Sequence, residues 1–235
     1  MLIKDTSNRG KNAIYTCLGA SNHVAFDRQS EDLYSTDPIA AELLLEALPE
    51  LKTMGKQVWE NSCGLLHLAD VFDKYGLLAK CSDILNRTND PRVEIIDFLQ
   101  INSGNGLLKP EEKYPYSIVM NPPYKSALAF VKKSLEILEE GRWVCAFLKL
   151  TFLEGKERKP FFLKFPPRYL FVSSSRIACA MNGEFYKPKL DKKGNQVLGA
   201  DGKPIMEKVQ SAVAYGWYCW KVGDYSHHTE IQWIN

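Results

Sequence analysis

The sequence predicts an α/β fold in which a mostly parallel sheet carries helices on both faces. Short apolar runs alternate with segments whose apolar residues recur every three or four positions, the pattern of strands alternating with helices. Hydrophobic residues make up 45% and charged residues 25% of the 235 positions, an ordinary globular composition. A chain of this length can bury the core of one large domain.

Charge and cysteine content exclude several classes of protein. The chain has 30 Lys and Arg residues against 28 Asp and Glu residues, so its net charge is +2 and nucleic acid could bind only at a local basic face. Its apolar stretches are too short to span a bilayer, and residues 1–11 lack a signal-peptide core. None of the six cysteines forms a CxxC pair, so we expect reduced, buried thiols in a cytoplasmic protein. The histidines lack metal-ligand spacing with them, and no metal site is expected.

The first predicted element after a polar, irregular N-terminal arm of residues 1–33 is a helix. Apolar residues between positions 39 and 51 repeat every four residues, as they do on one helix face. Asp37 can cap this helix, and Pro38 suits its first turn, where no amide hydrogen is needed. Gly55 ends the helix.

Strands and helices then alternate to about position 150. Helices are predicted at 65–75, where Gly76 is the stop signal, and at 126–139. Short apolar runs followed by acids, glycines or prolines predict the strands. They cover residues 57–60, 77–82, 93–96, 116–120 and 143–148, and apolar residues resume at 212–220 and at 231–234, the last as an edge strand.

Residues 187–208 differ in composition from the rest of the single predicted domain of residues 1–235. They are rich in Lys, Gly and Asp, and Gly194-Asn195 and Asp201-Gly202 are turn signals. We expect an exposed basic hairpin or loop inserted in the last third of the domain.

The tetrapeptide Asn121-Pro122-Pro123-Tyr124 is the sharpest chemical signal. It follows an apolar strand, at the end where open α/β sheets bind ligands. The Asn121 side-chain oxygen and the Pro122 carbonyl can accept both hydrogens of an exocyclic amine, which would free its nitrogen lone pair for methylation, and the prolines hold this turn rigid. Tyr124 offers a flat face on which an extruded base can stack. The competing interpretation of these four residues alone is a proline turn with Tyr124 in the core.

Residues upstream of the tetrapeptide match a known set of motifs in the same order. An acid ends each of three successive predicted strands, at Glu60, Asp83 and Asp97. Tyr34-Ser35-Thr36-Asp37-Pro38 matches a Tyr-x-Thr-x-Pro motif, and Glu60-Asn61-Ser62-Cys63-Gly64 matches an acid before a Cys-Gly turn. Asp83 matches an acid that binds ribose hydroxyls, and Asp97-Phe98 matches a pair beside the cofactor adenine. The chain thus resembles class I S-adenosylmethionine-dependent amino-methyltransferases, and among them the small phage and mobile-element DNA N6-adenine methyltransferases with gamma-like motif order.

This resemblance implies a fold, a cofactor and a reaction. The fold is the three-layer, Rossmann-like class I methyltransferase fold with about seven strands, the last of them antiparallel. The reaction is methyl transfer from S-adenosylmethionine, giving S-adenosylhomocysteine, to N6 of an adenine flipped out of DNA. The residues expected in catalysis are Asn121, Pro122, Pro123 and Tyr124. Those expected to bind the cofactor are Tyr34, Thr36, Pro38, Glu60, Cys63, Gly64, Asp83, Asp97, Phe98 and Asn121.

Basic residues on the later loops are expected to form a phosphate-binding rim beside the tetrapeptide. The candidates for DNA binding are Lys125, Lys156, Arg158, Lys159 and Arg176. Charge clusters of this kind are also typical of a merely solvated face. DNA is therefore the expected partner and a membrane is not, while a homodimer is left open.

One residue departs from the family pattern. The family turn reads Cys-Gly-x-Gly-His-Leu, whereas this chain has Leu66 at the second glycine, which normally lets backbone approach the methionine part of the cofactor. The Leu66 side chain could occlude that approach or force a different backbone path. A binding or regulatory protein that kept the fold and lost turnover is therefore a competing hypothesis. A third hypothesis keeps the enzyme class and changes the substrate to RNA adenine, to cytosine N4 or to a protein glutamine, since each presents a planar, delocalised nitrogen.

Overall fold

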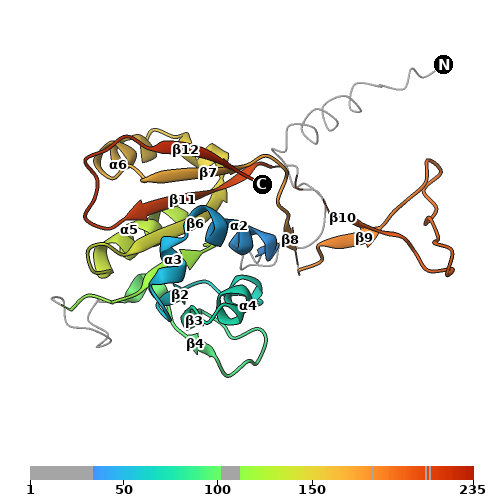
Figure 1. Ribbon diagram of the computed structural model, residues 1–235, viewed down its shortest axis with the longest axis horizontal. Coiled ribbons are helices and arrows are strands. Elements are labelled where there is room, and N and C mark those ends of the chain that lie inside the picture. The colour runs from blue at the N-terminus through green and yellow to red at the C-terminus, as the bar shows by residue number, and fades with distance from the viewer. Residues whose placement is uncertain (1–33, 102–111, 182, 210, 212) are drawn as a thin grey trace, which may run out of the picture. The chain divides into compact units, whose positions relative to one another are not determined.

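The computed structural model describes residues 34–101, 112–181, 183–209, 211 and 213–235 (Figure 1). Its main feature is an eight-stranded sheet with the order β12-β7-β11-β6-β5-β2-β3-β4. The strands of this sheet are β2 (Val58–Glu60), β3 (Leu78–Asp83), β4 (Val93–Ile95), β5 (Ser117–Met120), β6 (Trp143–Lys149), β7 (Tyr169–Ser173), β11 (Tyr215–Lys221) and β12 (Glu230–Ile234).

The sheet confirms the predicted fold class. All neighbouring pairs are parallel except those of β11, which is antiparallel to both β6 and β7. The antiparallel strand therefore lies inside the sheet. The strand predicted at 231–234 is β12, but it is parallel to β7 and not the antiparallel last strand that was expected. The eighth strand, which the sequence did not predict, is β7 between β12 and β11.

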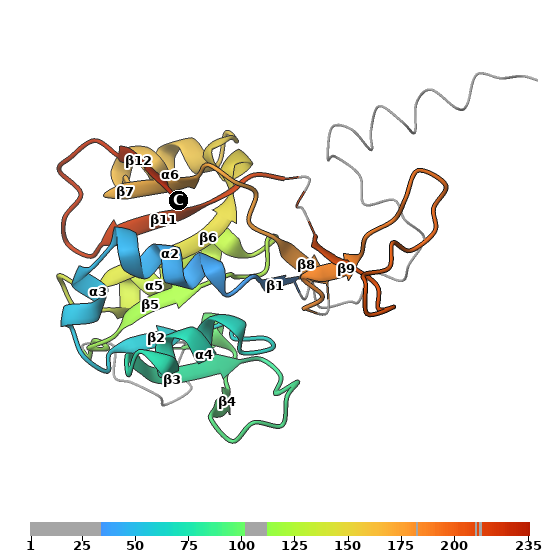
Figure 2. The same cartoon turned by 45° about the vertical axis from the view of Figure 1, so that its right-hand side comes forward.

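Helices cover both faces of the sheet, so the structure has three layers (Figures 1 and 2). The apolar residues of α2 (Ile39–Ala47) and α4 (His67–Lys74) pack into one core cluster, and those of α5 (Ala127–Ile137) and α6 (Arg158–Lys164) pack into another. Short 3-10 turns, η1 (Phe98–Gln100) and η2 (Leu150–Leu153), follow β4 and β6. No helix in the described ranges is long and apolar enough to span a membrane.

The first predicted helix is wrong in one respect. Its apolar repeat runs on to Leu51, but the structure breaks the segment into α2 and a short α3 (Glu50–Thr53). Pro49 lies at the break and accounts for it. Proline has no amide hydrogen for the helical bond and disfavours helical backbone in the residue before it. The predicted cap is confirmed, since the Asp37 carboxylate accepts the Ile39 N–H at 3.1 Å.

Two small sheets lie outside the main one. Strand β1 (Tyr34–Thr36), which the sequence did not predict, pairs antiparallel with β8 (Cys179–Met181) and places Thr36 opposite Cys179. Strands β9 (Tyr186–Pro188) and β10 (Met206–Lys208) also pair antiparallel (Figure 1). The residues between them are mostly exposed. The predicted N-terminal arm, residues 1–33, lies outside the described residues.

The described cysteines are free thiols. Cys63, Cys81, Cys145 and Cys219 are buried and Cys179 is half-buried. None of these five described cysteines is paired in a disulfide.

Candidate functional site

The candidate site lies where the order of the sheet reverses. Strands β2 and β3 run parallel to β5 and β6, and the chain moves outward from β2 to β3 and β4 but in the other direction from β5 to β6. Ligands of open α/β sheets bind at the carboxyl ends of the strands flanking such a point. Glu60 and Asp83 are the last residues of β2 and β3, and Asn121 follows β5 directly.

Buried polar atoms without partners concentrate at this point. Seven such side-chain nitrogen and oxygen atoms occur among the described residues. They belong to Ser35 on β1, to the segment from β2 into α4 (Glu60, Asn61, Ser62, His67) and to Asn121. Buried polar groups in folded proteins normally have a hydrogen-bond partner, so this concentration marks a place built for a polar ligand.

The side chain of Asn121 is held in one orientation by β1. Its amide nitrogen donates to the Tyr34 carbonyl at 2.9 Å and lies 2.8 Å from the Thr36 hydroxyl oxygen. A carbonyl can only accept, so the NH₂ end must face β1. The amide oxygen is then left as a buried acceptor without a partner. Asn121 therefore carries an acceptor that is oriented before any ligand arrives.

The two prolines after Asn121 differ in what their carbonyls do. Pro123 accepts the Ser126 N–H at 2.9 Å, at the start of α5. The Pro122 carbonyl is thus the candidate for a second acceptor beside Asn121.

Tyr124 lies in a cluster of aromatic and basic side chains. Its hydroxyl is 2.9 Å from that of Tyr215, its ring centroid is 5.5 Å from that of Tyr34, and Lys149 Nζ lies 4.5 Å from its centroid. Burial and the neighbouring Cys179 and Tyr215 raise the pKa of Tyr124, so its hydroxyl stays protonated at neutral pH. Burial also raises the pKa of Cys179 to about 11, so this thiol is not a reactive thiolate.

Glu60 is a buried acid, and one of its two carboxyl oxygens has no hydrogen-bond partner among the described residues. Only 2% of the residue is exposed, and burial, with the nearby Cys81 and Asp83, raises its pKa well above the ordinary value. The Ala69 N–H in the first turn of α4 bonds to its carboxyl group, while Oε2 has no partner. A positively charged ligand beside Glu60 would favour its ionised form.

Asp83 ties the turn after β2 to the end of β3. Its Oδ2 accepts the Gly64 N–H at 2.9 Å, and its Oδ1 is 2.8 Å from the Arg87 guanidinium. Cys63 beside it is 3% exposed, and its N–H donates to the Ser82 carbonyl at 3.0 Å. Oδ1 also accepts the Leu85 N–H at 3.3 Å, so at least three of the roughly four lone-pair sites of this carboxylate are used within the protein.

Leu66 occupies the backbone conformation that glycine favours. Its φ of 69° and ψ of 9° place it in the left-handed region, directly before α4. Its side chain is 3% exposed and packs into the core cluster of α2 and α4. The turn therefore keeps a glycine-like backbone path, and the side chain lies in the core.

The Asp97-Phe98 pair is placed differently from the other cofactor candidates. Phe98 is 2% exposed, with its ring stacked on Phe130 and edge-on to Trp59 in the core cluster of α5 and α6. Asp97 is exposed and caps η1 by accepting the Leu99 N–H at 3.1 Å. The structure thus brings Tyr34, Thr36 and Asn121 into direct contact, whereas Phe98 lies in the core.

A basic cavity of about 510 Å³ adjoins Tyr124. Its cationic lining residues are Lys125, Lys132, Lys156 and Arg158. Arg158 is braced against its own turn, 2.5 Å from the Glu154 carbonyl and 5.0 Å from the Phe152 ring. Lys159 lines the neighbouring cavity instead, and Arg176 lies beyond β7, 3.5 Å from the Ser211 carbonyl.

Several residues of the site were missed from the sequence. Ser35, Asn61, Ser62 and His67 carry unpaired buried atoms. A run of polar residues directly after a buried strand, from Glu60 to Ser62, was the available signal for two of them. Cys179, Tyr215 and Lys149 reach Tyr124 only through tertiary pairing, which no local pattern shows. No group of three His, Cys, Asp or Glu side chains in the described ranges could hold a metal ion.

Comparison with solved structures decides the fold. The chain superposes on a candidate RNA methyltransferase from Pyrococcus horikoshii with a TM-score of 0.51 and 14% identity, over 90% of this chain and 98% of the other. It superposes on a type I restriction-modification methyltransferase subunit from Streptococcus thermophilus with a TM-score of 0.54 and 11% identity, over 95% of this chain. The chain has the class I methyltransferase fold.

Further matches differ in length from this chain. This chain spans only 50% of the length of the Streptococcus subunit. It also matches the type IIG restriction endonuclease BpuSI with a TM-score of 0.52 and 14% identity, over 87% of this chain and 27% of the endonuclease. Neither a protein-family model nor a curated protein matches the sequence.

Proposed function

We propose that this chain is an S-adenosylmethionine-dependent methyltransferase that methylates the N6 amine of adenine in DNA. The observation that carries the proposal is the Asn121 side chain, whose amide nitrogen is anchored to β1 and whose oxygen is a buried acceptor without a partner. An amine donating a hydrogen to this oxygen would satisfy it.

The residues at the carboxyl ends of β2 and β3 suit this cofactor. It carries an ammonium group, a sulfonium and two ribose hydroxyls, and the site offers the unpaired Glu60 Oε2, both unpaired amide atoms of Asn61 and the Asp83 carboxylate. Tyr34, Thr36 and Pro38 border the same point from β1 and the start of α2, with Cys63 and Gly64 in the turn after β2. When bound, S-adenosylmethionine supplies an electrophilic methyl group, whose bond to sulfur breaks as the new C–N bond forms.

The chain's own residues prepare the acceptor amine. An exocyclic amine has its lone pair delocalised into the ring, and two acceptors that take both N–H hydrogens favour the pyramidal nitrogen with a free lone pair. Asn121 Oδ1 and the Pro122 carbonyl are the pair, and the proton that the methylated amine must lose goes to water. Tyr124 supplies the aromatic face for the flipped base, and alignment supplies most of the rate.

DNA is the favoured substrate for two reasons. Of the proteins with the same fold, one is by name a restriction-modification methyltransferase subunit and another a restriction endonuclease. The basic cavity beside Tyr124 can also receive phosphates. The similarity to a candidate RNA methyltransferase makes RNA adenine the second substrate to test.

The test is methyl transfer from labelled S-adenosylmethionine to matched DNA and RNA oligonucleotides, with nucleoside mass spectrometry of the product. We expect N6-methyladenine in DNA, absent with Asn121→Ala. Product confined to RNA, to cytosine or to protein would overturn the DNA assignment. No product and no cofactor binding by calorimetry at millimolar ligand would instead support a protein that kept the fold and lost turnover.

Thr36 is expected to act through Asn121 as a positioning residue. Thr36→Val keeps the side-chain shape but removes the hydroxyl beside the amide, at a cost of about 1–1.5 kcal/mol, so kcat should fall about tenfold. The KM for DNA should stay unchanged, and Thr36→Ser should restore kcat. A fall in cofactor affinity of the same size, with kcat intact, would instead place Thr36 on the cofactor.

The basic cavity predicts a salt effect on DNA binding. Each lysine that contacts a phosphate contributes about 0.9 to the slope of log K against log salt. Lys125→Gln with Lys156→Gln should therefore weaken binding and flatten this slope by about 1.8 in a fluorescence anisotropy titration. The matched control is Lys52→Gln with Lys56→Gln, two exposed lysines of which the first lies in α3 and the second three residues after its end. Equal slopes for the two double variants would contradict the assignment.

A further inference from the structure

Among the described strands, none pairs with the outer edge of β12. Strand β12 is the end strand of the main sheet, and β7 pairs with its other side. The Glu230 N–H donates to the Arg168 carbonyl and the Ile234 carbonyl accepts from Ser174, so backbone groups of these residues point toward β7. Since backbone direction alternates along a strand, the N–H and C=O groups of Ile231 and Trp233 point outward.

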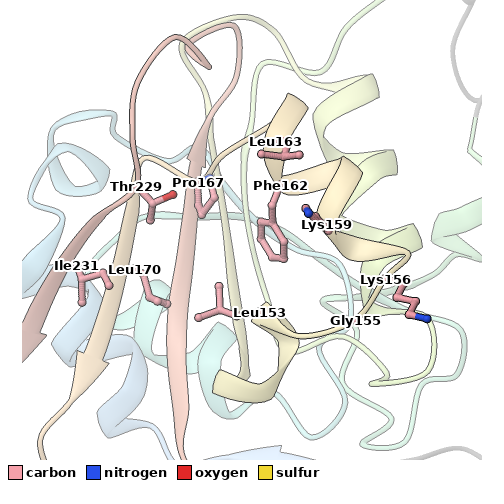
Figure 3. Close-up of a pocket in the computed structure, with 10 residues that line it drawn as sticks. All are labelled: Leu153, Gly155, Lys156, Lys159, Phe162, Leu163, Pro167, Leu170, Thr229 and Ile231. Carbon is pink, nitrogen blue, oxygen red and sulfur yellow. The ribbon is translucent and has the colours of Figure 1, made fainter.

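The side chains of these two residues are also unusually exposed. Ile231 is 51% and Trp233 is 72% exposed, and alternation places both on the sheet face that carries α6. Ile231 lines a cavity of about 640 Å³ between α6, η2 and β12 (Figure 3). The apolar walls include Leu153 and Leu163, which are 48% and 75% exposed. The edge thus combines free backbone groups with an adjoining apolar hollow.

We propose that β12 pairs antiparallel with β12 of a second copy of this chain, with the two-fold axis at Gln232. In this register each Ile231 faces the partner's Trp233. Both carry outward backbone groups, so each such pair exchanges two N–H to C=O bonds, four in all. The sheet would continue across the axis as sixteen strands, twice the eight of one copy.

The occupant is a second copy because β12 is complementary to itself. A two-fold interface requires residue i to meet j while j meets i, and the order Ile231-Gln232-Trp233 does this about its centre. Each cross-strand pair then joins an aromatic to a β-branched side chain, a favourable combination. The partner's Trp233 is brought beside Ile231, at the wall of the cavity in Figure 3. A phosphate backbone offers no donors to match the outward carbonyls, so a strand fits this edge better than nucleic acid.

A cysteine cross-link tests the register. Gln232 and its copy would form a non-hydrogen-bonded pair with Cα atoms about 4.5 Å apart, within the range of a disulfide. Gln232→Cys in the full chain should give a covalent dimer on mild oxidation, lost on reduction. Glu230→Cys is the matched control, because it would lie opposite Ile234 of the partner subunit and far from its own copy. Equal cross-linking of both variants, or of the unmodified chain, would overturn the proposed pairing.

The mass in solution provides an independent measurement. Sedimentation equilibrium of the unmodified chain should show a dimer that dissociates on dilution. Trp233→Lys should weaken it at least about tenfold, since a buried aromatic anchor carries a large share of binding energy. The control Leu198→Lys changes a leucine of 58% exposure on the β9–β10 hairpin and should leave the dimer intact. A monomer at every concentration, or a dimer indifferent to Trp233→Lys, would refute the proposal.

Discussion

Asn121→Ala is expected to lower kcat for methyl transfer by about 10²- to 10³-fold, the loss typical when one preorganised polar group is removed from a catalytic site. The acceptor that alanine removes is already oriented, because Tyr34 and Thr36 hold the amide nitrogen. The measurement is the single-turnover rate at saturating cofactor and DNA.

Two further readouts separate this role from a structural one. Cofactor affinity of the folded Asn121→Ala protein by calorimetry should stay close to that of the unmodified chain, because the lost oxygen has no partner among the described residues. The thermal midpoint should fall only modestly, through loss of the amide contacts to Tyr34 and Thr36. Asn121→Asp keeps the size and the acceptor oxygens but cannot donate to the Tyr34 carbonyl, so it should also be slow. A rate within threefold of the unmodified chain for Asn121→Ala would exclude Asn121 from the reaction.

The elements nearest the site were predictable because their signals are local. The buried strand β5 and the Asn-Pro-Pro-Tyr turn lie within eight consecutive residues, Ser117 to Tyr124, and an apolar run ending at prolines has few other interpretations. Glu60 and Asp83, predicted at strand ends, do end β2 and β3, whereas Asp97 lies beyond the end of β4 and caps η1. The parallel order of the sheet then placed Glu60, Asp83 and Asn121 at one edge.

What could not be predicted depends on pairing between distant segments. The atoms that orient Asn121 belong to residues 87 and 85 positions earlier, on a strand formed only by pairing with β8. Periodicity also cannot tell which face of the sheet a single aromatic residue meets. The ring contacts of Phe98, edge-on to Trp59 and stacked on Phe130, are an example that no local pattern predicts. Site residues that act through such contacts need the assembled fold.

Leu66 shows how a local rule can be broken without changing the backbone path. The sequence suggested that this leucine blocks the cofactor or diverts the chain. In the structure the backbone keeps φ at 69°, and the side chain contributes to the core. Left-handed backbone costs a non-glycine residue about 1–2 kcal/mol, and burial of the leucine in the α2–α4 core offsets that cost.

The stability of Leu66 variants should therefore reverse the usual ranking of alanine and glycine. Leu66→Ala loses the buried side chain and keeps the strained backbone, so the free energy of unfolding should fall by about 2–5 kcal/mol. Leu66→Gly loses the same packing but relieves the strain, and it should be about 1 kcal/mol more stable than Leu66→Ala in urea titrations. Cofactor affinity of the folded Leu66→Gly protein should match that of the unmodified chain, because the leucine side chain lies in the core and not in the site. A large gain in affinity on Leu66→Gly would show that Leu66 obstructs the cofactor after all, and alanine more stable than glycine would show that position 66 relaxes out of the left-handed region.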